Sequence, residues 1–300
     1  MHANLVFDSV PTQPNAFYLR PRGDRDQLLA EAENYVLLLH GLGADYSSLL
    51  AMISSGQAYQ GKMLKASGEP TYGQARILEY DTNGDYKPSD YYVESIAQPG
   101  QNFGIDYKSY KHKDEVIAYI VNHLLEVKSK LSPEAKIILH GRSFGGSVSA
   151  EVNFIQPGLV DRLILMSPTL AIAAAYEEAD QRLKESVELE AQENNGPIAE
   201  LNREWLDWGK ARLSEMKWAK AEKPFGDTPT IIFSGTADPE LTDYEALYYE
   251  TADDLFDHVE YRLIEEAKHD VFDFNSKVKA MKRLAAREFL EALQLSLIHI

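Results

Sequence analysis

The sequence predicts an α/β fold in which a mostly parallel sheet of eight strands is flanked by helices. Short apolar runs recur along the chain and alternate with segments of helical periodicity. Several of these runs end directly in turns that carry glycine, serine or acidic residues. In a parallel sheet such turns gather at one edge, where functional sites form. The length of 300 residues and the hydrophobic content of 44% suit a large domain with a sizeable core.

Strands are expected where short apolar runs are bounded by turn residues. In chain order they fall at 5–7, 16–19, 36–39, 75–80, 136–139, 162–166, from 230 onward, and 259–264. The first two are expected to be antiparallel edge strands. The stretch 81–113 is long, polar and rich in tyrosine, so we expect a loop there.

Helices are expected where apolar residues recur at spacings of three and four. Five of them fall at 46–54, 114–131, 147–155, 244–255 and 275–293. The stretch 169–228 shows no strand signal and is dense in alanine, glutamate and lysine, which predicts two further helices at 171–192 and 198–221. The last residues, 296–300, resemble a translated sequencing adapter and are expected to be artefactual or disordered.

The most informative motif spans Gly141 to Gly145 and fits the pattern G-x-S-x-G around Ser143. It follows a strand-like apolar run and precedes a segment that can form a helix. A serine on such a sharp turn sits under backbone strain, and the flanking glycines let the chain pass without a Cβ clash. The motif therefore predicts a nucleophilic serine at the N-terminus of a helix, where developing negative charge is stabilised.

Two backbone N–H groups are candidates to bind a developing oxyanion. The apolar run that starts at Tyr35 ends in a glycine-rich turn that can aim the N–H of Leu42 at a substrate. The second donor is the N–H of Phe144, directly after the nucleophile. His40 lies beside the glycine turn and is expected to brace it, whereas His140 lies beneath the serine with no route to its hydroxyl.

Serine needs an adjacent base, and His269, after the last predicted strand, is the candidate. Asp238 follows the strand that begins at 230 and is the candidate to orient that histidine. Glu240 and Asp270 compete for the same role. The chain order is serine, aspartate, histidine, each just past a strand end.

This constellation resembles the α/β-hydrolase family over roughly residues 15–292. Residues 232–238 and 266–272 look most like the branch of monoacylglycerol lipases and lysophospholipases. Two departures concern the loops that select substrates: Arg142 precedes the serine, and the turn after strand 75–80 begins at Asp81 instead of following the family pattern.

The resemblance implies the α/β-hydrolase fold with a helical lid inserted between strands six and seven. The domain boundaries that follow are 1–168 with 229–295 for the core and 169–228 for the lid. Within the lid, Trp205 and Trp208 are candidates to contact substrate, together with Arg142 beside the nucleophile.

The composition narrows the possible partners. A net charge of −17 argues against nucleic acid or an anionic membrane surface. Without cysteine there is no disulfide or thiolate chemistry, and no cluster has metal-ligand spacing, so no metal or cofactor is expected. No signal peptide or apolar span of membrane length is visible, which predicts a cytoplasmic protein.

The expected function is therefore hydrolysis of carboxylic esters through a Ser-His-Asp triad. The resemblance points to monoacylglycerols, lysophospholipids or short-to-medium acyl esters as small-molecule substrates. Alternatives on the same triad are a peptidase, a C–C bond hydrolase, a thioesterase and an acyltransferase. A binding protein that keeps the fold without catalysis is the alternative from another class. The sequence leaves the oligomeric state open.

Overall fold

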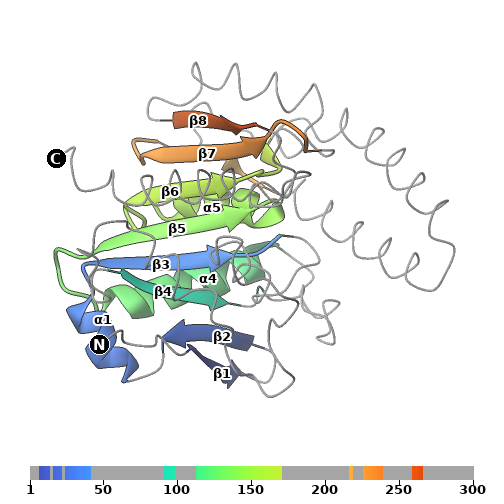
Figure 1. Ribbon diagram of the computed structural model, residues 1–300. Helices are drawn as coiled ribbons and strands as arrows, with labels where there is room; N and C mark the ends of the chain where they lie inside the picture. The colour runs from blue at the N-terminus through green and yellow to red at the C-terminus, as the bar shows by residue number, and fades with distance from the viewer. Residues whose placement is uncertain are drawn as a thin grey trace, which may run out of the picture.

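The computed structural model describes most of a central sheet and three helices of the chain (Figure 1). The described residues are 7–13, 16–21, 24–41, 91–96, 98, 113–170, 216–218, 226–238 and 259–265. For 7–13, 16–21, 91 and 113 only the backbone is described. The expected helices at 46–54, 171–192, 244–255 and 275–293, the strand at 75–80 and the tail 296–300 lie outside these residues.

Within the described residues eight strands form one mostly parallel sheet, which agrees with the fold class that the sequence predicted. They are β1 (Phe7–Gln13), β2 (Ala16–Pro21), β3 (Asn34–Leu39), β4 (Tyr91–Ile96), β5 (Lys136–Arg142), β6 (Arg162–Met166), β7 (Thr230–Gly235) and β8 (Val259–Ile264). Their spatial order is β1-β2-β4-β3-β5-β6-β7-β8. The β1–β2 and β2–β4 pairs are antiparallel, and every pair from β4 to β8 is parallel. The carboxyl ends of these parallel strands therefore share one edge.

The fourth strand corrects the sequence analysis, which expected a loop over 81–113. β4 lies inside that stretch and pairs in parallel with β3 along its whole length. Its middle contains two polar residues, Glu94 and Ser95, which hide the strand pattern. Both side chains are nevertheless buried, and Glu94 is only 1% exposed. β4 ends at Ile96, whereas the strand expected at 75–80 and the turn expected at Asp81 lie outside the described residues.

Three smaller differences concern the limits of elements. β1 runs from Phe7 to Gln13, and its proline is tolerated because β1 is an edge strand. The helix after the serine turn starts at Phe144, three residues earlier than expected. Residues 216 and 217 are not helical, so the helix expected over 198–221 does not run unbroken.

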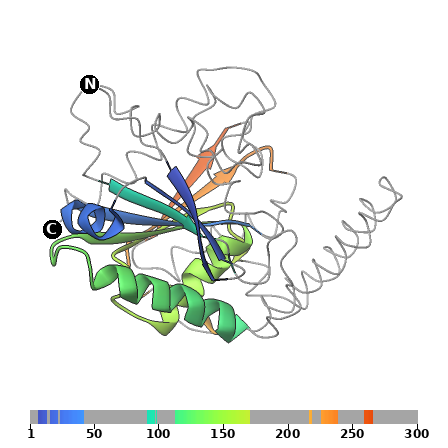
Figure 2. The same cartoon turned by 90° about the horizontal axis from the view of Figure 1, so that it is seen from below.

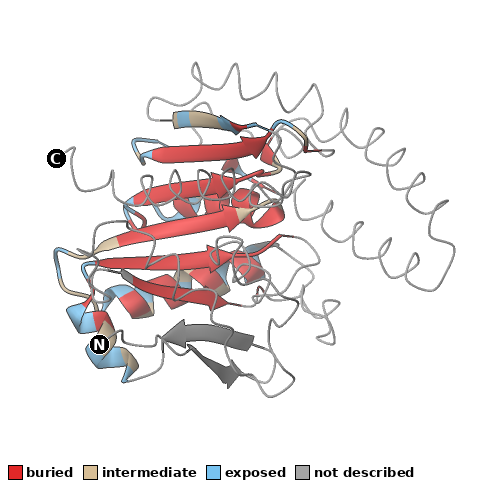
Figure 3. Ribbon diagram, in the orientation of Figure 1, coloured by how far each residue is buried: buried red, intermediate tan, exposed pale blue. Residues whose placement is uncertain are grey.

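Helices α4 (Lys113–Lys128) and α5 (Phe144–Ile155) lie on one face of the sheet (Figure 2). Helix α1 (Arg25–Glu31) lies beside the ends of the strands and contributes Leu29 to the same core. Helix α4 buries the apolar stripe that its spacing predicted: Val116, Ile117, Ile120, Leu124 and Val127. Burying each such side chain contributes about 1.5–3 kcal/mol. The central strands β3, β5, β6 and β7 are buried almost throughout, whereas β8 at the end of the sheet is partly exposed (Figure 3).

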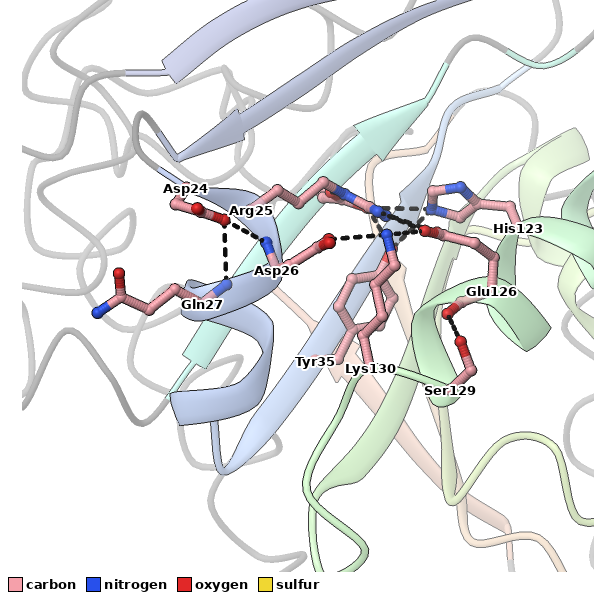
Figure 4. A network of polar contacts seen from close by, with 10 residues as sticks. Asp24, Arg25, Asp26, Gln27, Tyr35, His123, Glu126, Ser129 and Lys130 are labelled. Atoms are coloured by element: carbon pink, nitrogen blue, oxygen red, sulfur yellow. Dashed lines mark hydrogen bonds and ion pairs between the residues drawn. The ribbon is translucent and has the colours of Figure 1, made fainter.

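A buried polar network holds α1 and α4 to the sheet (Figure 4). Glu94 accepts hydrogen bonds from Arg25 Nε at 2.7 Å and from the Tyr35 hydroxyl at 2.7 Å, and it lies 3.0 Å from His123 Nε2. Arg25 also donates to Glu126 at 2.9 Å. Burial alone would raise the pKa of Glu94, but the bonds to His123 and Arg25 outweigh it and lower that pKa to about 2.

Helix α5 also fixes the chain at both sides of the segment 171–215. The hydroxyls of Ser147 and Thr169 are 2.9 Å apart. One turn further along α5, the buried carboxylate of Glu151 accepts hydrogen bonds from the backbone N–H groups of Lys217 and Trp218, at 2.8 and 3.0 Å. The Trp218 side chain is fully buried in the main core. It therefore packs against the fold and does not have the substrate-contact role that we expect for Trp205 and Trp208.

Candidate active site

Ser143 occupies the turn between β5 and α5, as the motif predicted. Its backbone has φ 51° and ψ −124°, a conformation that L-residues rarely adopt. Such strain costs about 1–3 kcal/mol and persists only when the surroundings impose it. Here the Ser143 N–H donates to the Met166 carbonyl at 2.9 Å, and the Ser143 carbonyl accepts from Gly146 N–H at 2.8 Å.

The glycines of the motif permit two close approaches of backbone to backbone. A Cβ on Gly145 would lie 2.5 Å from the carbonyl oxygen of His40, at the end of β3. A Cβ on Gly141 would lie 2.6 Å from the carbonyl carbon of Gly145, in the first turn of α5. Real Cβ atoms are not found so close to backbone, so only glycine lets α5 start against β3.

The turn after β3 reaches the serine. A Cβ built on Gly41 would lie 3.1 Å from Ser143 Cβ and 3.6 Å from Ser143 Oγ. The backbone at Gly41 is therefore next to the candidate nucleophile, where an oxyanion donor would be needed. Leu42, the residue that we expect to supply that donor, lies outside the described residues. Phe144 is described: it is the first residue of α5, at the positive end of the helix dipole.

His40 braces this turn, as predicted. Its Nε2 accepts a hydrogen bond from the Gln98 backbone N–H at 3.1 Å, so the proton is on Nδ1. Nδ1 then donates to the Gly41 carbonyl at 2.9 Å. The Gln98 side-chain amide donates in turn to the His40 carbonyl at 2.5 Å. These bonds tie the end of β3 to Gln98, two residues beyond β4.

His140 is buried within β5, and its Nδ1 donates to the Ile164 carbonyl at 2.8 Å. Burial lowers its pKa to about 4, the bond to Ile164 opposes this, and the charge of Arg142 adds to the lowering. The imidazole is therefore neutral at pH 7. A histidine that is buried and bonded in this way holds strands together, in agreement with the prediction that it does not act on the serine.

Asp238 lies three residues beyond β7 and is 8% exposed. Its backbone N–H donates to the Gly235 carbonyl at 3.2 Å, and Thr236 N–H donates to Ile264 of β8 at 3.0 Å. These bonds fix the turn at the same sheet edge as Ser143. The strands β5 and β7 are separated by β6 alone, so their ends are roughly 10 Å apart. That separation leaves room for an imidazole between the two side chains.

The whole-chain arrangement matches solved structures of known fold. Alpha/beta hydrolase domain-containing protein 10 from mouse superposes with a TM-score of 0.55 at 14% identity, covering 97% of this chain and 99% of that chain. A membrane phospholipase A described as a bacterial virulence factor gives 0.55 at 17% identity, with 98% and 87% covered. This protein has the α/β-hydrolase fold.

A third structure with this hydrolase fold is Est1E from Butyrivibrio proteoclasticus with ferulic acid bound. It gives a TM-score of 0.53 at 12% identity, covering 93% of this chain and 95% of that chain. By sequence, no protein-family profile and no curated protein matches the chain. The likeness is therefore visible in the arrangement of strands and helices and not in overall sequence.

Several predicted site residues of this hydrolase fold lie outside the described residues. They are Leu42, Trp205, Trp208, His269 and the two competing acids Glu240 and Asp270. β8 ends at Ile264, so His269 follows the strand next to β7 by five residues of sequence. Within the described ranges no group of three or more histidine, aspartate or glutamate side chains could hold a metal ion. Those ranges also hold no helix long and apolar enough to cross a membrane.

One residue at this edge escaped the sequence analysis. Ser167 directly follows β6, which lies between the strands that precede Ser143 and Asp238, and it has a positive φ of 41°. Its N–H donates to the Phe233 carbonyl of β7 at 2.7 Å. Ser143 and Ser167 are the two non-glycine residues with positive φ in the described part of the chain. No local signal pointed to it, because proline at 168 favours extended backbone with negative φ at the residue before it.

Proposed function

We propose that this protein is a serine hydrolase that cleaves carboxylic esters through a covalent acyl-enzyme. The observation that carries the proposal is the strained backbone of Ser143 at the end of β5, beside the turn of Gly41. Strain of this kind holds a serine hydroxyl clear of the sheet on a fold of this type. The placement of Asp238 at the end of β7 supports the second member of a triad at the same edge.

In the proposed reaction, Ser143 Oγ attacks the ester carbonyl while His269 takes the hydroxyl proton as general base. The negative charge that develops on the carbonyl oxygen is bound by the N–H groups of Leu42 and Phe144. The location of Phe144 at the start of α5 supports this role, because the helix dipole places partial positive charge there.

Collapse of the tetrahedral intermediate breaks the bond to the alkoxy group. His269 then donates its proton to the leaving alcohol, which leaves an acyl group on Ser143. Water, activated by the same histidine, cleaves this second ester and restores the enzyme. Asp238 accepts a hydrogen bond from the histidine throughout, so that it fixes the tautomer and stabilises the imidazolium.

The proposed substrates are esters of short-to-medium acyl chains, including monoacylglycerols and lysophospholipids. The segment 169–228 would fold as a lid whose Trp205 and Trp208 line the acyl pocket. The anchoring of Thr169 and Trp218 on α5 supports a segment that begins and ends close to the nucleophile helix. Each methylene that enters such a pocket contributes about 0.8 kcal/mol.

The first experiment uses a fluorophosphonate probe, which reacts with activated serines. We expect a single label on the wild-type protein, located at Ser143 by peptide mass spectrometry, and none on Ser143→Ala. Turnover of the variant should fall by roughly 10⁴–10⁶. Labelling of the alanine variant, or an unlabelled wild type, would refute the hydrolase and favour a binding protein with this fold.

The second experiment measures kcat/KM on p-nitrophenyl esters from acetate to palmitate. We expect the value to rise with chain length to a limit and then fall. A flat profile or an optimum at acetate would reject the lipase-like substrate range. Faster cleavage of an aminoacyl amide than of any ester would show a peptidase instead.

A further inference from the structure

Arg142, the residue before the candidate nucleophile, carries a charge that the described structure does not balance. Its Nε is buried and has no hydrogen-bond partner. Arg25, also largely buried, shows how this chain treats a structural arginine: two carboxylates, Glu94 and Glu126, bind it. An isolated charge in a poorly solvated place is costly, so the contrast calls for an explanation.

The neighbours of Arg142 on the sheet are neutral. In register, Arg142 pairs with Met166 of β6. Alternation along β5 places it on the same face as His140, which is neutral at pH 7 and whose pKa the arginine helps to lower. Among the residues that the structure describes, none forms an ion pair with Arg142. Parts of the residue remain accessible, since Arg142 as a whole is only half-buried.

We propose that Arg142 binds an anionic group of the substrate, a carboxylate or a phosphate close to the scissile ester. The inference rests on the esterase function proposed above and names the substrate class of that site. A guanidinium presents planar donors that match either anion in pairs. The positive end of α5, which starts two residues later, acts in the same direction.

The charge of the whole chain makes this local cation informative. At −17, the protein repels anions at long range. An anionic substrate therefore needs a fixed positive group at the site, and Arg142 is one residue from the serine. Of the two lipid classes considered above, the phosphate-bearing lysophospholipids fit this site better than the neutral monoacylglycerols.

The test compares esters that differ only in charge. The first pair is p-nitrophenyl hydrogen adipate, which carries a carboxylate on its acyl chain, and the neutral p-nitrophenyl hexanoate. The other pair is lysophosphatidate and the monoacylglycerol with the same acyl chain, in which a phosphate is gained on the leaving group. We expect the wild type to prefer the anionic member of at least one pair by about 10- to 100-fold in kcat/KM, and the pair that responds identifies the anion.

Two variants assign the preference to the arginine. Arg142→Met should lose the preference: the ratio of kcat/KM for the anionic ester to kcat/KM for its neutral partner should fall to about 1, through a higher KM for the anionic ester. Arg142→Lys should keep part of the preference, because it keeps the charge but not the paired donors. The neutral ester serves as the control for folding and for an intact triad in each variant.

A measurement on the wild type covers the case in which Arg142→Met does not fold. Adipate or glycerol 3-phosphate should slow fluorophosphonate labelling of Ser143 at concentrations where hexanoate or glycerol does not. Equal rates for charged and neutral esters in the wild type, or equal losses for both in Arg142→Met, would overturn the proposal. Fluorophosphonate labelling of Ser143 with no anionic preference rejects this inference alone, whereas absence of labelling rejects the proposed hydrolase.

Discussion

The backbone N–H of Ser143 donates a hydrogen bond of 2.9 Å to the carbonyl of Met166, the last residue of the neighbouring strand. The same step repeats along the edge: Ser167 donates to Phe233 of β7, and Thr236 donates to Ile264 of β8. Each strand end is thus bonded to the next strand end in the sheet order from β5 to β8. A chain of backbone hydrogen bonds thus connects the turn of Ser143 to the turn of Asp238.

The strain at Ser143 predicts an unusual stability order for two inactive variants. Glycine adopts positive φ without a steric penalty, whereas alanine at the same position would still carry that penalty. At an ordinary position glycine is less stable than alanine by roughly 0.5–1 kcal/mol. Here we expect Ser143→Gly to equal or exceed Ser143→Ala in its free energy of unfolding, as measured by urea denaturation. A glycine variant clearly less stable than the alanine variant would show that the turn is unstrained.

The contact between α5 and β3 predicts that Gly145→Ala disrupts the site. The added Cβ would press on backbone at Leu39 and His40, which cannot move aside as a side chain can. We expect a loss of about 3 kcal/mol or more in stability, in the range of severe overpacking, together with lost fluorophosphonate labelling. Thermal unfolding and labelling of the purified variant measure both.

Gly158→Ala is the matched control for that variant. Gly158 has a φ of +77°, and a Cβ there would meet nothing within 4 Å. Its alanine variant should lose only the cost of the backbone conformation, about 1–2 kcal/mol, and should label normally. If both variants behaved alike, crowding against β3 would not be the reason that position 145 requires glycine.

The acid of the proposed triad is tested by amide substitutions. Asp238→Asn should lower kcat on the order of 10⁴, because an amide favours the wrong tautomer of the histidine. Glu240→Gln and Asp270→Asn should change kcat by far less. Fluorophosphonate labelling rates of the three variants give an independent comparison. A collapse of activity in Asp270→Asn, with Asp238→Asn near normal, would transfer the role to Asp270.

The network around Glu94 predicts a dependence of stability on pH. The pKa of Glu94 is about 2 in the folded protein, below its ordinary value of 4.5. Its ionised form therefore adds stability above about pH 4.5, and this contribution is lost as the pH falls toward 2. The difference corresponds to on the order of 3 kcal/mol.

Glu94→Gln should accordingly be less stable than the wild type by roughly 3 kcal/mol at pH 7. The gap should narrow as the pH falls from 5 toward 2, which denaturant titrations at a series of pH values can follow. Glu134→Gln, at an exposed position, should track the wild type throughout. A gap that stays constant over this range would mean that Glu94 is not ionised in the folded network.

The sequence predicted those features that depend on neighbouring residues. The serine turn follows from Gly141, Ser143 and Gly145 within five positions, and the buried strands β3, β5, β6 and β7 follow from continuous apolar runs. β4 was missed because the burial of Glu94 depends on Arg25 and Tyr35, which are 69 and 59 residues away in the chain. No local pattern reveals that a carboxylate has a distant partner.

Some residues of the candidate site are placed by the structure where the sequence predicted, and others stay predictions. Ser143 lies in the turn that its motif predicted, and Asp238 follows β7 as its position after an apolar run indicated. The role of His269 stays a prediction, as do the contacts of Leu42, Trp205 and Trp208. Trp218 shows the limit of composition: it lies in the same predicted lid segment as the other two tryptophans, yet its side chain belongs to the main hydrophobic core.

The two anchors on α5 bear on how this protein can be re-engineered. Ser147 holds the chain at Thr169, and Glu151, one helical turn away, holds it at Lys217 and Trp218. A segment of foreign origin and different length could be grafted between these fixed points without altering the spacing of the strands. Libraries that randomise 171–215 while keeping both anchors are thus the natural starting point for altering selectivity, since Ser143 and Asp238 of the proposed triad lie outside that segment.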